Sequence, residues 1–284
     1  MILLAFLACS PNLAETDTAV DLPATRPLAE PTGACPDLSS SGRTTMSSNG
    51  EDRDFYVFFP PDAGPDLPVV YYWHPLGGTA SMMVNYLDLE QVAADNNVVL
   101  VVPDALDTNP FEWNFVAGEA EAADDLALFD DLRTCLSDQR QIDLRRVYST
   151  GMSAGGLWTT FLSIHRGDAL ASILVMSGGT GNMVQYSTPA GEPFPALLVW
   201  GGPTDIFDAG PLQINFTETT AAFSEQLRTD EHFVMQCEHD GGHDLPPDPV
   251  AMTVDWLLPH IYGEPSPWRD RDPTELQDIC FLPQ

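Results

Sequence analysis

The chain has 284 residues, of which 44% are hydrophobic and 19% are charged, and this composition is typical of a globular protein with a sizeable core. Its formal net charge of −31 arises from 42 acidic and 11 basic residues, and all the basic residues are Arg. Such a charge argues against nucleic acid as a partner, and the absence of Lys excludes both a Lys-dependent phosphate loop and Schiff-base catalysis.

The first residues predict export. An apolar run from Ile2 to Ala8 leads directly into Cys9, which is typical of a bacterial lipoprotein signal whose Cys receives the lipid. Phe6 and the lack of a preceding Arg depart from that pattern, so an ordinary signal peptide stays open as an alternative. We expect a bacterial protein that is either secreted or attached to the cell-envelope membrane through Cys9.

The next segment predicts a tether. Residues 10–36 are rich in Pro, Thr, Ala and Asp and show little hydrophobic periodicity, as a flexible linker does. We therefore expect a signal and tether over residues 1–36 and one folded domain over residues 37–284.

The cysteines predict disulfides. Beyond Cys9, four remain at wide spacings that do not match a zinc site: Cys35, Cys135, Cys237 and Cys280. Four cysteines allow two disulfides in any of three pairings, and the sequence leaves that choice open. We expect no metal and no cofactor.

Strand-like and helix-like segments alternate along the predicted domain. Residues 53–60 predict a strand that forms a hairpin with residues 44–48. Further strands are predicted at residues 67–73, 98–102, 146–150, 170–176, 196–200 and 232–237. Helices are predicted at residues 80–96, 120–136, 154–166, 217–227 and 249–261. This order indicates a mostly parallel sheet with helices on both faces and function at the C-terminal strand ends.

The strongest motif is Gly151-Met152-Ser153-Ala154-Gly155, which follows a predicted strand and opens a predicted helix. A G-x-S-x-G sequence in this setting predicts a nucleophile elbow, a tight turn that exposes the Ser hydroxyl above the sheet. Ser153 is therefore the candidate nucleophile.

A Ser nucleophile needs a His to take its proton and a carboxylate to orient that His. In sheets with this elbow, the acid and then the base follow the Ser in the chain. Asp205, after the strand at 196–200, is the candidate acid, and Asp208 is its competitor. His243, in a Gly-rich loop after the last strand, is the candidate base, and His239 is the alternative.

The oxyanion of an acyl-transfer intermediate needs two backbone donors. One is the Ala154 amide, which directly follows the nucleophile. The other is expected in the turn His74-Pro75-Leu76-Gly77-Gly78. Because Pro75 has no N–H, Leu76 is the candidate.

Together these motifs resemble the secreted esterases related to polyhydroxybutyrate depolymerases and feruloyl esterases. The matching segments are RDFYVFFP from Arg53, HPLGG from His74, VVPDAL from Val101, Trp113, IDLRRVYSTGMSAGG from Ile142, GGPTD from Gly201 and GGHDLP from Gly241. The resemblance implies an α/β-hydrolase fold, a triad of Ser153, Asp205 and His243, and the hydrolysis of carboxylic esters without a cofactor.

The short segment between the strands at 170–176 and 196–200 predicts no large lid, and therefore an open cleft that suits exposed esters of polymers or aromatic acids. The candidate aromatic residues that contact substrate are Trp113, Phe115, Trp158 and Phe207. Two other functions stay open: a serine peptidase of the same fold and a catalytically silent binding protein.

Overall fold

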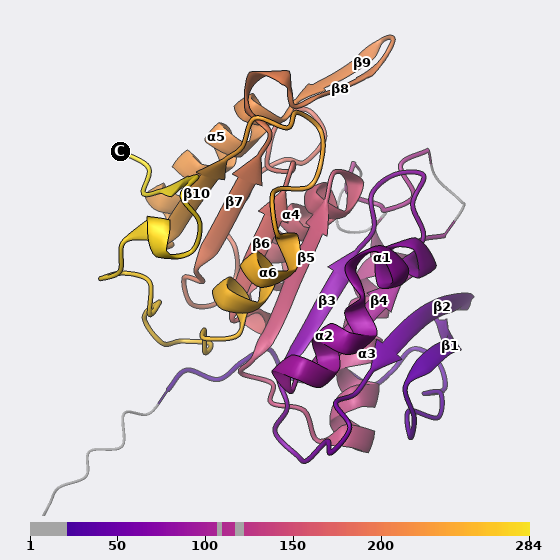
Figure 1. Ribbon diagram of the computed structural model, residues 1–284. Coiled ribbons are helices and arrows are strands. Elements are labelled where there is room, and N and C mark those ends of the chain that lie inside the picture. The colour runs from indigo at the N-terminus through magenta and orange to yellow at the C-terminus, as the bar shows by residue number, and fades with distance from the viewer. Residues whose placement is uncertain (1–21, 107–109, 117–121) are drawn as a thin grey trace, which may run out of the picture.

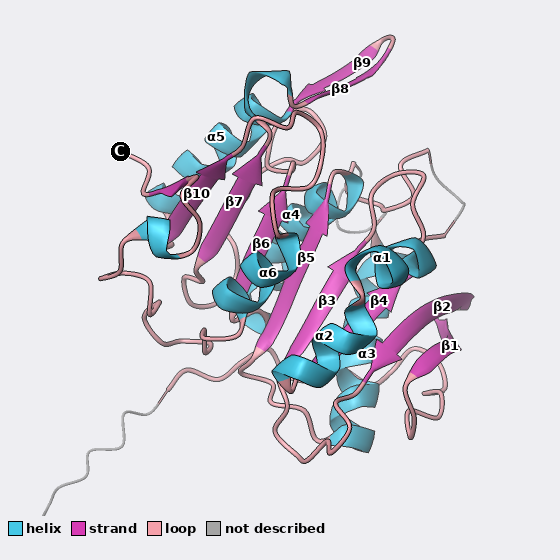
Figure 2. Ribbon diagram, viewed as in Figure 1, coloured by secondary structure: helices cyan, strands magenta, loops and turns pink. Residues whose placement is uncertain are grey.

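A central sheet with helices on both faces forms the body of the protein (Figures 1 and 2). The computed structural model describes residues 22–106, 110–116 and 122–284. Within these residues, the main sheet has the strand order β1-β2-β4-β3-β5-β6-β7-β10-β11. The six strands from β4 to β10 are parallel, while β1, β2 and β11 run antiparallel to their neighbours. The prediction of a mostly parallel sheet is therefore confirmed.

The strands are short and their central members are buried along their whole length. The main-sheet strands are β1 Gly42–Ser48, β2 Glu51–Phe58, β3 Val69–Trp73, β4 Val99–Pro103, β5 Val147–Met152, β6 Ser172–Met176, β7 Ala196–Trp200, β10 Val234–Glu238 and β11 Cys280–Phe281. The six parallel strands agree with the predicted ranges to within a few residues. The continuous apolar runs have the physical meaning expected of them, since strands covered on both faces have no solvent-exposed side to carry polar residues.

Two separate apolar layers hold the helices to the sheet. Alternate side chains of β3 show the division, because Val69, Tyr71 and Trp73 pack on one face while Val70 and Tyr72 pack on the other. The first face is covered by α3 Ala123–Arg140, α4 Ala154–Arg166 and α5 Phe216–Thr229. The second is covered by α1 Ala80–Leu87, α2 Leu89–Asn96 and α6 Pro249–Leu257, which lie in front of the sheet in Figure 1.

Three predicted helices differ from the structure, and the one expected at 120–136 continues to Arg140. The single helix expected at 80–96 is divided at Asp88, whose left-handed φ of 50° ends α1 and begins α2. The last helix ends at Leu257 rather than at Ile261, because Pro259 has no N–H and cannot continue the hydrogen-bond ladder of the helix. In the part of the chain that the structure describes, no helix has both the length and the apolarity needed to cross a bilayer.

A small hairpin was not predicted. Strands β8 Ile206–Ala209 and β9 Leu212–Asn215 pair antiparallel through a two-residue turn in which Gly210 has a φ of +74°. The hairpin projects from the body at the C-terminal end of β7 (Figure 1). Its two ends are joined, since the Phe216 amide donates to the Asp205 carbonyl at 3.0 Å.

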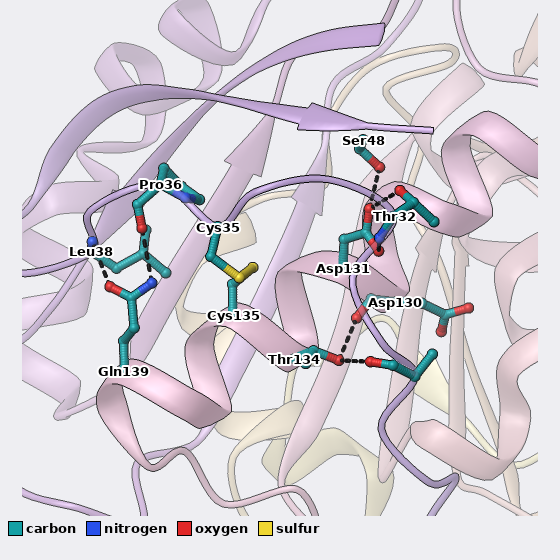
Figure 3. Close-up of a disulfide and its surroundings, with 11 residues drawn as sticks. Thr32, Cys35, Pro36, Leu38, Ser48, Asp130, Asp131, Thr134, Cys135 and Gln139 are labelled. Carbon is teal, nitrogen blue, oxygen red and sulfur yellow. Dashed lines mark hydrogen bonds between the residues drawn. A yellow bond between two sulfur atoms is a disulfide. The ribbon is translucent and has the colours of Figure 1, made fainter. Parts of the chain in front are cut away.

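The expected tether is wrong for its second half. Residues 22–36 lie along the body, and a disulfide joins Cys35 to Cys135 of α3 (Figure 3). Thr32 donates to the Asp131 carboxylate, and the Thr134 hydroxyl donates to the Ala29 carbonyl. Composition alone missed these contacts because they are made by backbone and small polar groups rather than by an apolar face. Residues 22–36 therefore belong to the folded body and not to a flexible tether, while residues 1–21, including Cys9, lie outside the described residues.

A second disulfide closes the far edge of the sheet. Cys237 of β10 and Cys280 of β11 are direct cross-strand partners and are bonded to each other. The two disulfides resolve the pairing that the sequence left open, and they use the four cysteines expected to form them.

Candidate active site

Ser153 lies at the turn between β5 and α4, with φ 56° and ψ −117°. This backbone conformation is costly for a residue with a side chain and persists only where its surroundings enforce it. Gly155 shows how closely the surroundings pack, because a Cβ at that position would lie 2.0 Å from the Trp73 carbonyl oxygen of β3. The glycine therefore allows α4 to start directly against the end of the sheet, which raises the Ser153 hydroxyl above the C-terminal strand ends.

Three polar side chains from different loops meet at this point. The Ser153 Oγ lies 2.9 Å from Nε2 of His243, and Nδ1 of His243 lies 2.7 Å from Oδ1 of Asp205. Because the Asp205 carboxylate accepts a hydrogen bond from the Nδ1–H group, Nε2 is left with a lone pair that accepts from the Ser153 hydroxyl. The structure thus brings together the three residues that the motifs singled out, although they are far apart in the sequence.

Asp205 is held rigidly. Its side chain is fully buried, and its second oxygen accepts hydrogen bonds from the Ser177 hydroxyl and the Gly201 amide, both at 2.8 Å. Gly201 also brings the two loops together, since a Cβ there would lie 1.7 Å from the Gly242 carbonyl oxygen. Gly201 of the GGPTD motif is therefore explained by the direct contact of its loop with Gly242 of the GGHDLP motif, which brings together the loops that carry the acid and the imidazole.

The imidazole of His243 is supported on one face. The ring of Phe216, the first residue of α5, stacks on it with a centroid separation of 4.8 Å and an interplanar angle of 7°. The His243 side chain remains 24% exposed, so its other surroundings are open to an incoming substrate.

The two competing residues lie elsewhere. Asp208 is in β8, where its carboxylate accepts from Gly210 and Gln213 of the same hairpin. His239 is buried, accepts a hydrogen bond from the Gly241 amide, and has its pKa lowered by burial. The structure therefore places Asp205 and His243 at Ser153, and the alternative residues outside this hydrogen-bonded chain.

The loop that carries Leu76 is held by hydrogen bonds to residues that follow β4 in the chain. His74 is buried, and its Nε2 accepts from the Ala105 amide, while the Trp113 indole donates to the His74 carbonyl at 2.9 Å. Glu112 accepts from the Gly77 amide at 3.0 Å. Leu76 and Ala154 line the same depression as Ser153, and the Ala154 amide, in the first turn of α4, has no acceptor within its helix.

A small apolar depression adjoins the Ser153 hydroxyl. Besides Leu76 and Ala154, its lining residues are Phe111, Phe115, Leu157, Phe207, Ile214 and Phe216. Phe207 and Ile214 are cross-strand partners in the β8–β9 hairpin, which therefore forms one wall. We call this feature the apolar depression.

The expected roles of the aromatic residues are partly wrong. Phe207 and Phe115 line the apolar depression, but Trp113 and Trp158 are fully buried and pack beneath it against Trp73. Indole rings are large enough to fill the space between the sheet and α4, so these two support the site instead of contacting substrate. Sequence position near a motif loop does not separate these two roles.

Several residues of the site were not predicted. Ser177 follows β6 directly, so a polar residue at a strand end was an available signal. Phe216 and Ile214 gave no signal, because their place depends on a hairpin that the sequence pattern did not show. In the described ranges 22–106, 110–116 and 122–284, no group of three or more His, Cys, Asp or Glu side chains is arranged to hold a metal ion.

Comparison with known proteins agrees with this geometry. No family model matches the chain. It is 28% identical over 166 residues to feruloyl esterase D of Neurospora crassa, which covers 53% of this chain and 54% of that protein. It is 22% identical over 301 residues to an oxidized polyvinyl alcohol hydrolase of a Sphingopyxis species, covering 82% of each. The chain spans about half the length of this feruloyl esterase D and of a feruloyl esterase B that it also matches.

Solved structures show the same fold. The structure titled sOPH superposes with a TM-score of 0.70 at 19% identity, over 88% of this chain and 96% of that one. The chain has the α/β-hydrolase fold. The fold prediction is confirmed, and so is the resemblance to feruloyl esterases.

Proposed function

We propose that the protein is a serine esterase that hydrolyses carboxylic esters through an acyl-enzyme. The observation that carries the proposal is the continuous hydrogen-bonded chain from the Ser153 hydroxyl through His243 to the buried Asp205 carboxylate. Such a chain makes a Ser hydroxyl nucleophilic, because the imidazole accepts the proton as the oxygen attacks. The names of the matched relatives, among them feruloyl esterases and an oxidized polyvinyl alcohol hydrolase, support this reaction class.

The reaction follows from the roles of these groups. The Ser153 Oγ attacks the ester carbonyl while Nε2 of His243 takes its proton, and the amides of Leu76 and Ala154 stabilise the oxyanion. His243 then protonates the departing alcohol, which leaves the acyl group on Ser153. A water molecule, deprotonated by His243, attacks the acyl-enzyme and releases the acid. Asp205 holds the ring orientation and stabilises the imidazolium that forms in both steps.

The site is suited to substrates presented on a surface. The His243 side chain is partly exposed, and the β8–β9 hairpin contributes Phe207 and Ile214 to one wall of the apolar depression beside Ser153. We propose that esters of aromatic acids or exposed esters of polymers are the substrates, with the acyl group against Phe115 and Phe207.

The same proposal extends to location. Two disulfides in one chain favour an oxidising compartment outside the cytosol. We propose export, and attachment to a membrane through a lipid on Cys9 is the more specific form of that proposal.

The decisive experiment compares Ser153→Ala with Ser187→Ala, which removes an exposed Ser hydroxyl elsewhere. We expect Ser153→Ala to reduce kcat/KM for p-nitrophenyl acetate and methyl ferulate by about 10⁴-fold or more and to abolish labelling by a fluorophosphonate, while Ser187→Ala keeps both. If the fluorophosphonate does not label the wild-type protein, the protein is a catalytically silent binding protein. Faster turnover of peptide anilides than of esters would indicate a peptidase.

A further inference from the structure

A second cavity lies beyond the hairpin, across Ile214 from the apolar depression. It has a volume of about 290 Å³ and is enclosed by β9, the first half of α5 and the loop at residues 180–183. Ile214 lines both hollows, so the two are neighbours. We call the second hollow the polar recess.

The polar recess differs from the apolar depression in its chemistry. Its hydrogen-bonding residues carry hydroxyl and amide groups: Thr180, Asn182, Gln213, Asn215 and Thr219. Glu218 is its one charged residue among those the structure describes, no Arg lines it, and the chain contains no Lys. A substrate carboxylate would meet Glu218 without a compensating cation, whereas a neutral hydroxyl group can donate to that carboxylate or bind the amides.

Some of these groups are already committed and some are free to bind. The Asn215 side chain caps α5, and the Thr219 hydroxyl donates to the Gly178 carbonyl. Asn182 is exposed, and its side-chain amide makes no hydrogen bond with any described residue. Gln213 uses its amino group on Asp208 at 3.2 Å, which leaves its carbonyl oxygen available as an acceptor.

We propose that the polar recess binds a neutral, hydroxyl-bearing part of the ester substrate while the apolar depression holds an apolar part beside Ser153. This inference rests on the proposed esterase function. The hairpin then lies between the two parts of the substrate. Phe207 of β8 and Ile214 of β9 contact the apolar part, while Gln213 of β9 lines the recess that holds the polar part. The substrate class is thus an amphipathic ester that carries hydroxyl groups and no negative charge.

Four esters with the same acyl length test the proposal. Methyl hexanoate is the apolar reference, methyl 6-hydroxyhexanoate carries the hydroxyl on the acyl side, glycerol monohexanoate carries hydroxyls on the alcohol side, and monomethyl adipate carries a carboxylate. We expect one of the two hydroxylated esters to have a kcat/KM about tenfold above the reference, and which one it is identifies the side of the ester that enters the recess. The adipate ester should be the poorest substrate. A preference for the reference ester, or for adipate, would overturn the proposal.

A matched pair of variants localises the effect. Ala222 of α5 lines the polar recess, whereas the adjacent Ala221 is exposed on the helix surface. Ala222→Phe should fill the recess and lower the ratio of kcat/KM between the hydroxylated ester and methyl hexanoate about tenfold, and Ala221→Phe should leave that ratio unchanged. Asn182→Ala should lower the same ratio about threefold to fivefold, as expected for one lost hydrogen bond.

The two failures are distinguishable. If wild-type protein hydrolyses no ester faster than Ser153→Ala does, the esterase proposal fails. If wild-type hydrolyses all four esters but Ala222→Phe and Ala221→Phe give the same ratios, the enzyme stands and the role of the recess is wrong.

Discussion

The nucleophile turn and the β8–β9 hairpin lie on either side of the same hydroxyl, yet they are built in opposite ways. The turn at Ser153 packs against neighbouring strands, and the atoms nearest to a Cβ at Gly151, Gly155 or Gly156 are all backbone atoms. The hairpin projects from the body, and most of its residues are exposed. Its order depends on one small antiparallel ladder and on the side chains of Phe207 and Ile214, which pack toward the site.

This contrast indicates that the sheet-built turn serves the reaction itself, while the hairpin serves the choice of substrate. Atoms that react must be held within a fraction of an ångström, and backbone fixed by neighbouring strands provides that precision. Groups that choose among substrates can sit on an appended element, because their contacts tolerate small movements. We therefore expect changes in the sheet-built part to affect every substrate alike, and changes in the hairpin to affect substrates unequally.

The largest expected effect is in the turn. A Cβ on Gly155 would overlap the Trp73 carbonyl oxygen, so Gly155→Ala must displace α4 or β3. We expect kcat to fall at least ~10²-fold for all esters and the free energy of unfolding to fall by about 3 kcal/mol, measured by urea denaturation. Gly64→Ala is the control, since a Cβ at Gly64 meets no atom within 4 Å. Equal loss in both variants would contradict the close-contact explanation.

The second effect is a loss of free energy of unfolding that leaves kcat nearly unchanged. The Cys35–Cys135 disulfide spans a sequence separation of 100 residues and attaches the N-terminal segment to α3, and no triad residue is among its neighbours in Figure 3. The double variant Cys35→Ser, Cys135→Ser should lower the free energy of unfolding by about 2–4 kcal/mol, because the unfolded chain gains freedom. kcat for p-nitrophenyl acetate at 25 °C should change less than about twofold. A large loss of kcat in the folded variant would show that the segment supports the site.

The third effect depends on pH and concerns His260, which follows α6 in the chain. Burial lowers the pKa of His260 to about 4, and its ring donates to the Trp256 carbonyl and accepts from the Ser266 hydroxyl. Since the unfolded His has a pKa near 6.5, the unfolded chain binds more protons between these values. This contribution to stability is complete above pH 6.5 and is lost as the pH falls toward 4. From pH 7 to 5 we expect a loss of about 2 kcal/mol that His260→Gln does not show, measured by urea unfolding at both pH values.

The smallest effect should be the most selective. Phe207→Ala removes part of one wall of the apolar depression, whereas Ile206→Ala changes the neighbouring residue, which is exposed and does not line it. Phe207→Ala should lower kcat/KM for methyl ferulate about tenfold relative to p-nitrophenyl acetate, since less apolar surface is buried with the larger acyl group. Ile206→Ala should keep the ratio. An equal loss of kcat/KM for both substrates would show instead that the hairpin supports the catalytic residues and does not select among substrates.

The sequence predicted the sheet-built part because its constraints are local. The G-x-S-x-G turn, the glycine pairs before Asp205 and His243, and the apolar strands each follow from the geometry of a short segment. The hairpin escaped prediction because its strands are four residues long and Ile214 is their one buried residue, so neither periodicity nor burial distinguishes them from a loop. Trp113 and Trp158 were misplaced for a related reason, since an indole in a core and an indole in a cleft are identical in sequence.

The amide-to-carbonyl bond between Phe216 and Asp205 has a further consequence. It closes the chain at the base of the hairpin, so the acid and the ring that supports the imidazole are joined to each other independently of what lies between them. We therefore expect that residues 206–214 can be shortened, lengthened or replaced by those of another hydrolase with little cost to the spacing of the triad, provided that Asn215 remains as the cap of α5. The β8–β9 hairpin is therefore the segment beside Ser153 in which we expect new substrate preferences to be easiest to introduce.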